Sequence, residues 1–70
     1  MNDTYTAVIK HCDPWWIGWI EEVPGVNCQE ASKAELLESL KITLREMLEF
    51  NRQEALDAAG DIFEEEPVAL

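Results

Sequence analysis

Residues 15–27 read WWIGWIEEVPGVN, a stretch that holds all three tryptophans of the 70-residue chain and leads into a Pro-Gly turn. Side chains of a β-strand alternate between the two faces of a sheet. A strand here therefore has two apolar faces, one made by Trp15, Ile17 and Trp19 and the other by Trp16 and Ile20. A chain this short has one helix-sized layer to cover a sheet, so we expect the second face to meet another subunit or protein.

The flanking segments predict two further strands. Residues 5–10 (YTAVIK) are rich in β-branched and aromatic side chains, and residues 11–14 (HCDP) carry turn chemistry. Pro24 and Gly25 give a second turn, after which a shorter strand can follow. We therefore predict a three-stranded antiparallel meander with strands at about residues 4–10, 15–22 and 25–30.

A capping box predicts where a long helix begins. The Ser32 hydroxyl can accept a hydrogen bond from the amide of Glu35, and the Glu35 carboxylate can accept one from the amide of Ser32. No Pro or Gly occurs from Lys33 to Ala59, and Gly60 is a natural stop. An apolar stripe at helical spacing is formed by Leu36, Leu37, Leu40, Leu44, Met47 and Leu48. The helix is thus expected over about residues 33–59.

The predicted helix is too long for the predicted sheet. At 1.5 Å per residue it would be about 40 Å long, so its second half overhangs strands of five to seven residues. Apolar side chains off the main stripe, together with the tryptophans, are our candidate protein-interface residues: Trp15, Trp16, Trp19, Ile42, Phe50 and Leu56. The tail, residues 61–70, could add a short fourth strand at a sheet edge, where Pro67 would be tolerated. The expected fold is a single α+β domain over residues 1–70 with the order β-β-β-α.

Charge and hydropathy limit the partners. Fifteen acidic and five basic residues give a net charge of −10, which disfavours direct nucleic-acid binding and favours a basic protein partner. No stretch approaches the roughly 20 apolar residues of a membrane span, and the N-terminus has no signal pattern. We therefore expect a cytoplasmic protein with no membrane contact, in which Cys12 and Cys28 are reduced thiols.

No catalytic, cofactor or metal site is predicted. His11, Cys12 and Asp13 include the residue types of a nucleophile, a base and an orienting acid, but consecutive residues in a tight turn point in different directions. His11, Cys12 and Cys28 supply three candidate metal ligands without the Cys-x-x-Cys spacing of a zinc site. Residues 64–66 (EEE) are typical of a solvated charge run. We expect that the chain is not an enzyme and binds no cofactor.

The ordered set of features resembles the HicB family of antitoxins. The resemblance runs from Tyr5 to about Phe50. It comprises a Tyr-x-Ala-x-Ile first strand, an aromatic second strand, an acidic-to-Pro-Gly turn and a capped Leu-rich helix, carried by Tyr5, Ala7, Ile9, Glu21, Glu22, Pro24, Gly25, Leu36, Leu37 and Leu40. This resemblance implies a partial ribonuclease H-like fold. It also implies binding and inhibition of HicA, a small, basic, mRNA-cleaving toxin.

The sequence departs from the family pattern at two places. Members often have Gly at the position of Glu30, whereas Glu30-Ala31-Ser32 keeps the cap without the glycine. Many members carry a C-terminal DNA-binding domain, and ten residues after Gly60 are too few for one, so we expect no promoter binding by this chain. Metal-dependent nucleases of the ribonuclease H fold have an acidic residue in the first strand, and residues 5–10 have none, so no nuclease activity is expected.

Our leading hypothesis is a HicB-like, antitoxin-type protein-binding module. It would form a homodimer or higher oligomer and could neutralise a small basic HicA-type toxin by binding it. The alternative is a stand-alone oligomeric structural or regulatory module without a toxin partner. A basic reading frame beside the gene would favour the first hypothesis over the second.

Overall fold

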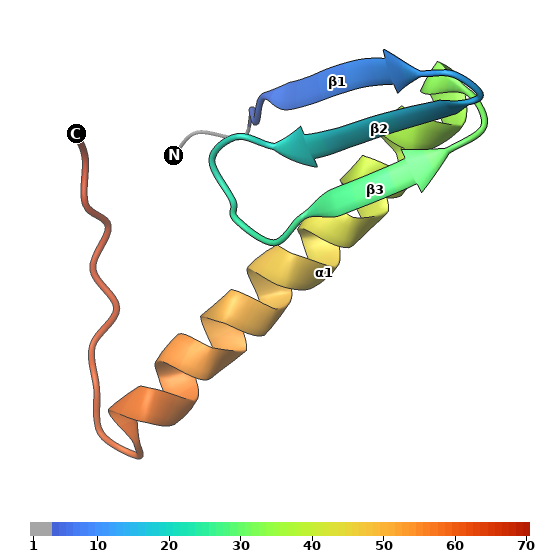
Figure 1. Ribbon diagram of the computed structural model, residues 1–70. Helices are drawn as coiled ribbons and strands as arrows, with labels where there is room; N and C mark the ends of the chain where they lie inside the picture. The colour runs from blue at the N-terminus through green and yellow to red at the C-terminus, as the bar shows by residue number, and fades with distance from the viewer. Residues whose placement is uncertain (1–3) are drawn as a thin grey trace.

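The computed structural model describes residues 4–70 and has an α+β fold, in which a three-stranded antiparallel sheet is followed by one long helix (Figure 1). The strands lie in the order β1-β2-β3, with β1 at Ala7–Cys12, β2 at Trp15–Ile20 and β3 at Asn27–Glu30. The helix, α1, spans Lys33–Ala59. The predicted meander followed by a long helix is confirmed.

Four of the six strand ends differ from the predicted ones by two or three residues, and β1 begins at Ala7 rather than at residue 4. β1 continues to Cys12, because the chain reverses only at Asp13 and Pro14 and Cys12 pairs directly with Trp15. β2 ends at Ile20 rather than at residue 22, and β3 begins at Asn27 rather than at residue 25. The segment between them leaves the sheet because Val23 and Val26 turn into the core, where 7% and 0% of their surfaces remain exposed.

The beginning of α1 has one of the two hydrogen bonds of the predicted capping box, and among residues 4–70 the reciprocal bond from the Ser32 amide to the Glu35 carboxylate is not formed. The backbone amide of Glu35 donates to Oγ of Ser32 at 3.2 Å, and the amide of Leu36 donates to the Ser32 carbonyl at 3.0 Å. Oγ of Ser39 donates to Oε2 of Glu30 at 2.6 Å and so ties the helix to the end of β3. The helix ends before Gly60, whose φ of 81° suits glycine.

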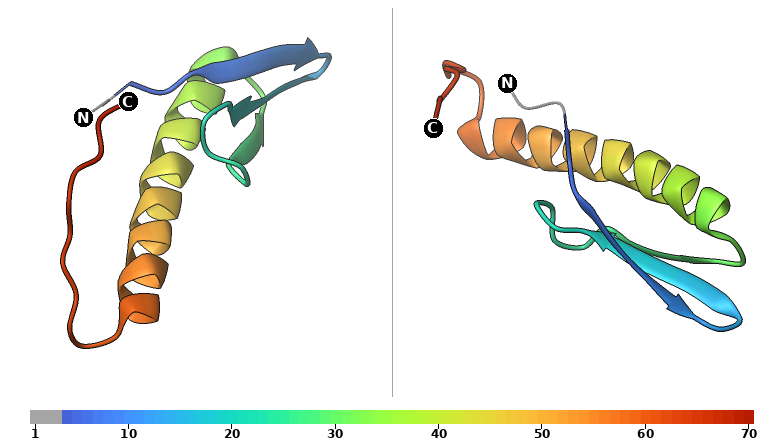
Figure 2. Two further views of the ribbon diagram at one scale, coloured as in Figure 1. Left: turned by 90° about the vertical axis from the view of Figure 1, so that its left-hand side faces the viewer. Right: turned by 90° about the horizontal axis from the view of Figure 1, so that it is seen from above.

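The helix covers one face of the sheet, which we call the inner face. Gly18 lies at its centre, where a Cβ atom in place of its hydrogen would meet the side chains of Leu36 and Leu40 at 3.2 Å each. The missing side chain therefore lets α1 approach β2 closely. The buried core comprises Ile20, Val23, Val26, Leu36 and Leu40. α1 lies on one side of the sheet (Figure 2) and packs mainly on β2 and β3, and an apolar groove lies between α1 and β1.

The second half of α1 extends away from the sheet, and the tail turns back. The molecule measures 50 × 24 × 15 Å, and α1 continues well beyond the strands (Figure 1). After Gly60 the chain reverses, and residues 61–70 run back toward the sheet apart from α1. Within residues 4–70 the tail pairs with no strand, so the fourth strand considered for it is not formed by this single chain. The overhang of α1 explains this, because it starts the tail far from any sheet edge.

Candidate functional site

The face of the sheet opposite α1 exposes two of the three tryptophans. We call it the outer face, and strand register assigns to it Val8, Lys10, Cys12, Trp15, Ile17, Trp19, Asn27 and Gln29. Trp15 is 45% and Trp19 37% exposed, and Ile17 between them is half-buried. Within residues 4–70 no helix or strand covers this face (Figure 2). Indole rings exposed on one face of a sheet are typical of protein-binding surfaces.

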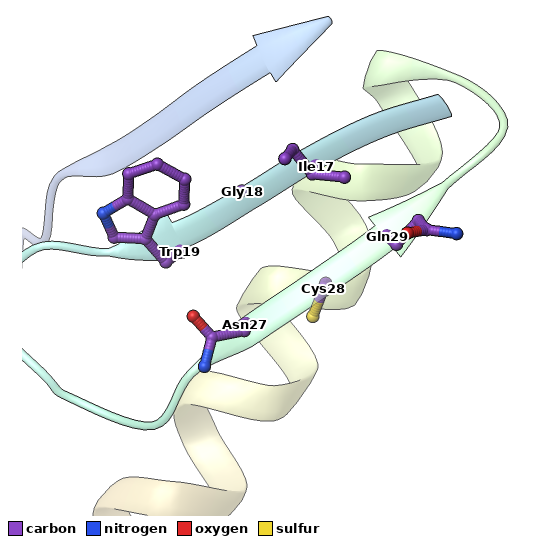
Figure 3. Close-up of a pocket in the computed structure, with 6 residues that line it drawn as sticks. All are labelled: Ile17, Gly18, Trp19, Asn27, Cys28 and Gln29. Carbon is purple, nitrogen blue, oxygen red and sulfur yellow. The ribbon is translucent and has the colours of Figure 1, made fainter. Parts of the chain in front are cut away.

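A shallow pocket lies on the outer face between β2 and β3. It has a volume of about 350 Å³ and is lined by Ile17, Gly18, Trp19, Asn27, Cys28 and Gln29. Figure 3 shows the Trp19 indole and the Ile17 side chain on β2 and the two amide side chains on β3. The pocket thus combines an apolar wall with hydrogen-bonding groups of Asn27 and Gln29, a combination that suits a protruding side chain of another protein.

The outer face has no acidic residue, although the chain as a whole has a net charge of −10. Among the residues of the three strands the only acidic one is Glu30, and its partner Trp16 places it on the inner face. Lys10 is the only charged residue of the outer face. The surrounding turns carry Asp13, Glu21 and Glu22. An apolar centre with a charged rim is the usual composition of a protein interface.

Trp16, which the sequence grouped with the interface candidates, lies on the inner face. It is half-buried and packs against the core. Its indole stacks on the imidazole of His11, with ring centroids 4.2 Å apart and an angle of 7° between the planes. The structure thus separates Trp16 from Trp15 and Trp19 and gives it the environment of a core residue.

The three helical candidates do not join the outer face, because α1 lies on the other side of the sheet. Ile42 is 48% and Phe50 59% exposed, and Leu56 is half-buried. Phe50 lines a shallow pocket of about 290 Å³ with Thr43, Glu46 and Met47. The six candidates therefore occupy three separate places: the outer face, the inner face and α1.

An apolar groove, absent from our sequence-based candidates, lies between β1 and α1. This β1–α1 groove has a volume of about 290 Å³ and is lined by Thr4, Tyr5, Ala7, Ile20, Leu37, Leu40, Lys41 and Leu44. Leu37 belongs to the apolar stripe of the helix, yet 43% of it is exposed. The groove exists because α1 lies over β2 and β3. The spacing of apolar residues along the helix predicts which side of the helix is buried, but it does not predict which strands the helix covers.

The residues with catalytic or metal-binding chemistry are dispersed. Nε2 of His11 lies 4.0 Å from Oδ1 of Asp13, and both side chains are more than half exposed. Cys12 and Cys28 are free thiols on opposite faces of the sheet, and Sγ of Cys28 lies 3.5 Å from Oγ1 of Thr43. Within residues 4–70 no three His, Cys, Asp or Glu side chains are grouped so that they could hold a metal ion. In the same part of the chain, no helix has the length and apolar character to cross a membrane.

One carboxylate at the rim has a shifted pKa. The backbone N–H of Thr6 donates to Oε1 of Glu22 at 2.7 Å, and this hydrogen bond lowers the pKa of the Glu22 carboxyl below its usual 4.5. Beside it, the amide of Glu21 donates to the Thr6 carbonyl at 2.9 Å. Both bonds extend the pairing of β1 with β2 beyond the end of the strands.

Comparison of the chain with protein-family models, with curated proteins and with solved structures found no match.

Proposed function

We propose that this protein is a non-enzymatic, HicB-like antitoxin-type module that binds a small, basic, mRNA-cleaving toxin of HicA type through its outer face. The observation that carries the proposal is the exposure of Trp15 and Trp19 on a face whose strands present no carboxylate, in a chain of net charge −10. The ordered sequence features that resemble the HicB family support the choice of partner.

The two parts of this surface have different physical roles. Burial of Trp15 and Trp19 supplies affinity, since tryptophans are enriched among the residues whose truncation costs about 2 kcal/mol or more of binding free energy. The carboxylates of Asp13, Glu21 and Glu22 around the face attract a basic partner and raise its association rate. The proposal places the chain in the cytoplasm, where its two free thiols stay reduced.

The test is to mix the purified protein with the HicA-type toxin encoded beside its gene and to measure RNA cleavage and complex formation by gel filtration. We expect suppression of cleavage and a stable complex. The double variant Trp15→Ala with Trp19→Ala should bind at least about 30-fold more weakly. Phe50→Ala is the matched control, because it removes an exposed aromatic ring from α1 and should leave affinity unchanged. Undiminished cleavage without a complex would exclude the toxin-binding role.

The alternative function is a stand-alone oligomeric module without a toxin. The apolar side chains exposed on the tail and on α1 favour this alternative, because they offer contact area to further copies of the chain. A gene neighbourhood without a small basic reading frame would select it.

A further inference from the structure

The outer edge of β1 has unpaired backbone groups. The carbonyl of Thr6 accepts from Glu21 of the β2 side and its N–H donates to Glu22, so both backbone groups of Thr6 point toward β2. Backbone direction alternates along a strand, and therefore the N–H and C=O groups of Ala7, Ile9 and His11 point away from β2. Within residues 4–70 no strand lies on that side of β1. Such an edge is a template for an added strand.

The tail is a segment without a partner. All residues from 61 to 70 are exposed, with Ile62 at 95% and Val68 at 85%. Within the described residues, no hydrogen bond joins the tail to the sheet or to α1. Apolar side chains so exposed on an extended segment are typical of a strand that pairs with another chain.

Pro67 restricts how the tail can pair. Proline has no N–H, so in an edge strand its nitrogen points away from the neighbouring strand. Alternation then makes Glu66, Val68 and Leu70 the residues whose backbone groups face the partner strand. Only Glu66, Val68 and Leu70 can therefore form the backbone hydrogen bonds to a partner strand. Two of these three residues, Val68 and Leu70, have large apolar side chains.

We propose that the tail of a second copy of this chain adds to β1 as an antiparallel strand, with Leu70 opposite Ala7, Val68 opposite Ile9 and Glu66 opposite His11. Directly opposite residues of antiparallel strands point their side chains to the same face. Ala7, Ile9 and His11 lie on the inner face, since they pair with Ile20, Gly18 and Trp16. Val68 and Leu70 therefore enter the β1–α1 groove.

The groove fits these side chains. Leu70 lies beside Ala7, whose short side chain leaves the space that the groove occupies, and it covers Leu37, which is 43% exposed. Val68 lies beside Ile9, which is only half-buried in the single chain. Glu66 lies beside the half-exposed His11 side chain, which can donate to its carboxylate. In this register the apolar side chains of Val68 and Leu70 contact apolar side chains of the groove, and the carboxylate of Glu66 lies beside the imidazole of His11.

The reach of the chain excludes its own tail from this register. His11 pairs with Trp16 and Trp16 with Glu30, so His11 lies at the end of the sheet where α1 begins. α1 has 27 residues and carries Gly60 about 40 Å from that end. The six residues from Gly60 to Glu66 extend at most about 22 Å. The tail of a second copy can reach β1, because the distance between Gly60 and β1 of the same chain does not limit it. When each copy gives its tail to the other, the result is a closed dimer with two-fold symmetry.

Disulfide trapping tests the register in full-length chains in which Cys12→Ser and Cys28→Ser remove the native thiols. One chain carries Ile9→Cys, the other carries Val68→Cys, and the two are mixed and oxidised. Opposite residues of paired strands have Cα atoms about 5.5 Å apart, within disulfide range. We expect a covalent heterodimer on a non-reducing gel. The matched control pairs Ile9→Cys with Ala69→Cys, which faces the other side of the tail and should give at least five-fold less product.

Two outcomes of the trapping experiment would overturn the proposal. One is equal yields from the Val68 and Ala69 pairs. The other is a disulfide within one chain that carries Val8→Cys and Val68→Cys, because it would show the tail paired in parallel with its own β1. The second outcome corresponds to a monomer whose tail contributes its apolar side chains to the outer face.

A second measurement avoids substitutions in the sheet. Light scattering should give the mass of a dimer for the native chain, and Val68→Asp with Leu70→Asp should weaken dimerisation at least ten-fold while the circular dichroism of α1 is unchanged. Ala69→Asp is the control and should remain dimeric. A native chain that is monomeric at about 100 μM would contradict the exchange. The outer-face variant Trp15→Ala with Trp19→Ala should dimerise normally, so failure of this inference and failure of the toxin-binding proposal are distinguishable.

Discussion

The imidazole of His11 lies flat against the indole of Trp16, with 4.2 Å between the ring centroids and 7° between the planes. The two residues are direct cross-strand partners in β1 and β2. Stacked aromatic pairs of this kind contribute about 0.5–1.5 kcal/mol beyond the burial of their surface. The stack closes the inner face at the end where α1 begins, so Trp16 acts as part of the fold.

Trp16→Ala should therefore lower the free energy of unfolding by about 2–4 kcal/mol, because it removes a half-buried indole and its stacking on His11. Trp15→Ala, on the outer face, should change it by less than about 1 kcal/mol. Urea unfolding followed by circular dichroism measures both. Equal effects of the two substitutions would contradict the division of the tryptophans between the faces.

Gly18→Ala should destabilise the protein by about 1–3 kcal/mol. The added Cβ would lie 3.0 Å from the Val8 carbonyl oxygen and 3.2 Å from both Leu36 and Leu40, and the backbone oxygen cannot move aside as a side chain can. Thermal unfolding would show the loss as a lower midpoint temperature. Gln29→Ala, at an exposed position of β3, is the control and should stay within about 0.5 kcal/mol of the native chain.

The hydrogen bond from Thr6 to Glu22 predicts a pH effect. Because the folded-state pKa of Glu22 is lowered from 4.5, its contribution to stability is present above about pH 4.5 and is lost as the pH falls through the folded-state pKa. Glu22→Gln keeps an acceptor oxygen and removes the titration. Between pH 6 and about pH 3 the urea midpoint of the variant should therefore fall less than that of the native chain. Parallel pH profiles would show that the bond does not persist in solution.

Salt should act in opposite directions on the two proposed associations. Two copies of net charge −10 repel each other, so raising NaCl from 50 to 500 mM should strengthen the tail-exchanged dimer. The same change should slow association with a basic toxin, because it screens the attraction. Sedimentation measures the first effect and stopped-flow fluorescence of the tryptophans the second. A dimer that weakens with salt would mean that ion pairs such as Glu66 with His11 dominate it.

The elements of the fold were predictable because their signals are local. The Ser32–Glu35 capping box and Gly60 mark both ends of α1, and the predicted range 33–59 agrees with the helix in the structure. The strand ends were less accurate, because Val23 and Val26 leave the sheet to enter the core and this depends on packing against α1.

The candidate surface was predictable only in part. Alternation along residues 15–20 separates the two apolar faces, but it does not say which one α1 covers. Gly18 is the residue that could have assigned the faces, because a glycine inside a strand often marks a close approach of another element. The β1–α1 groove depends on the position of α1 over β2 and β3, a property of three-dimensional packing that periodicity does not encode.

The overhang of α1 has a mechanical consequence. Leu48 is the last residue of α1 that packs against the core, so the helix continues unsupported to Ala59 for about 16 Å. A tilt of α1 by 10° about its contact with Gly18, which Leu36 and Leu40 make, would displace Gly60, about 30 Å away along the helix, by roughly 5 Å. Any small repacking around Gly18 would therefore move the start of the tail by several ångström.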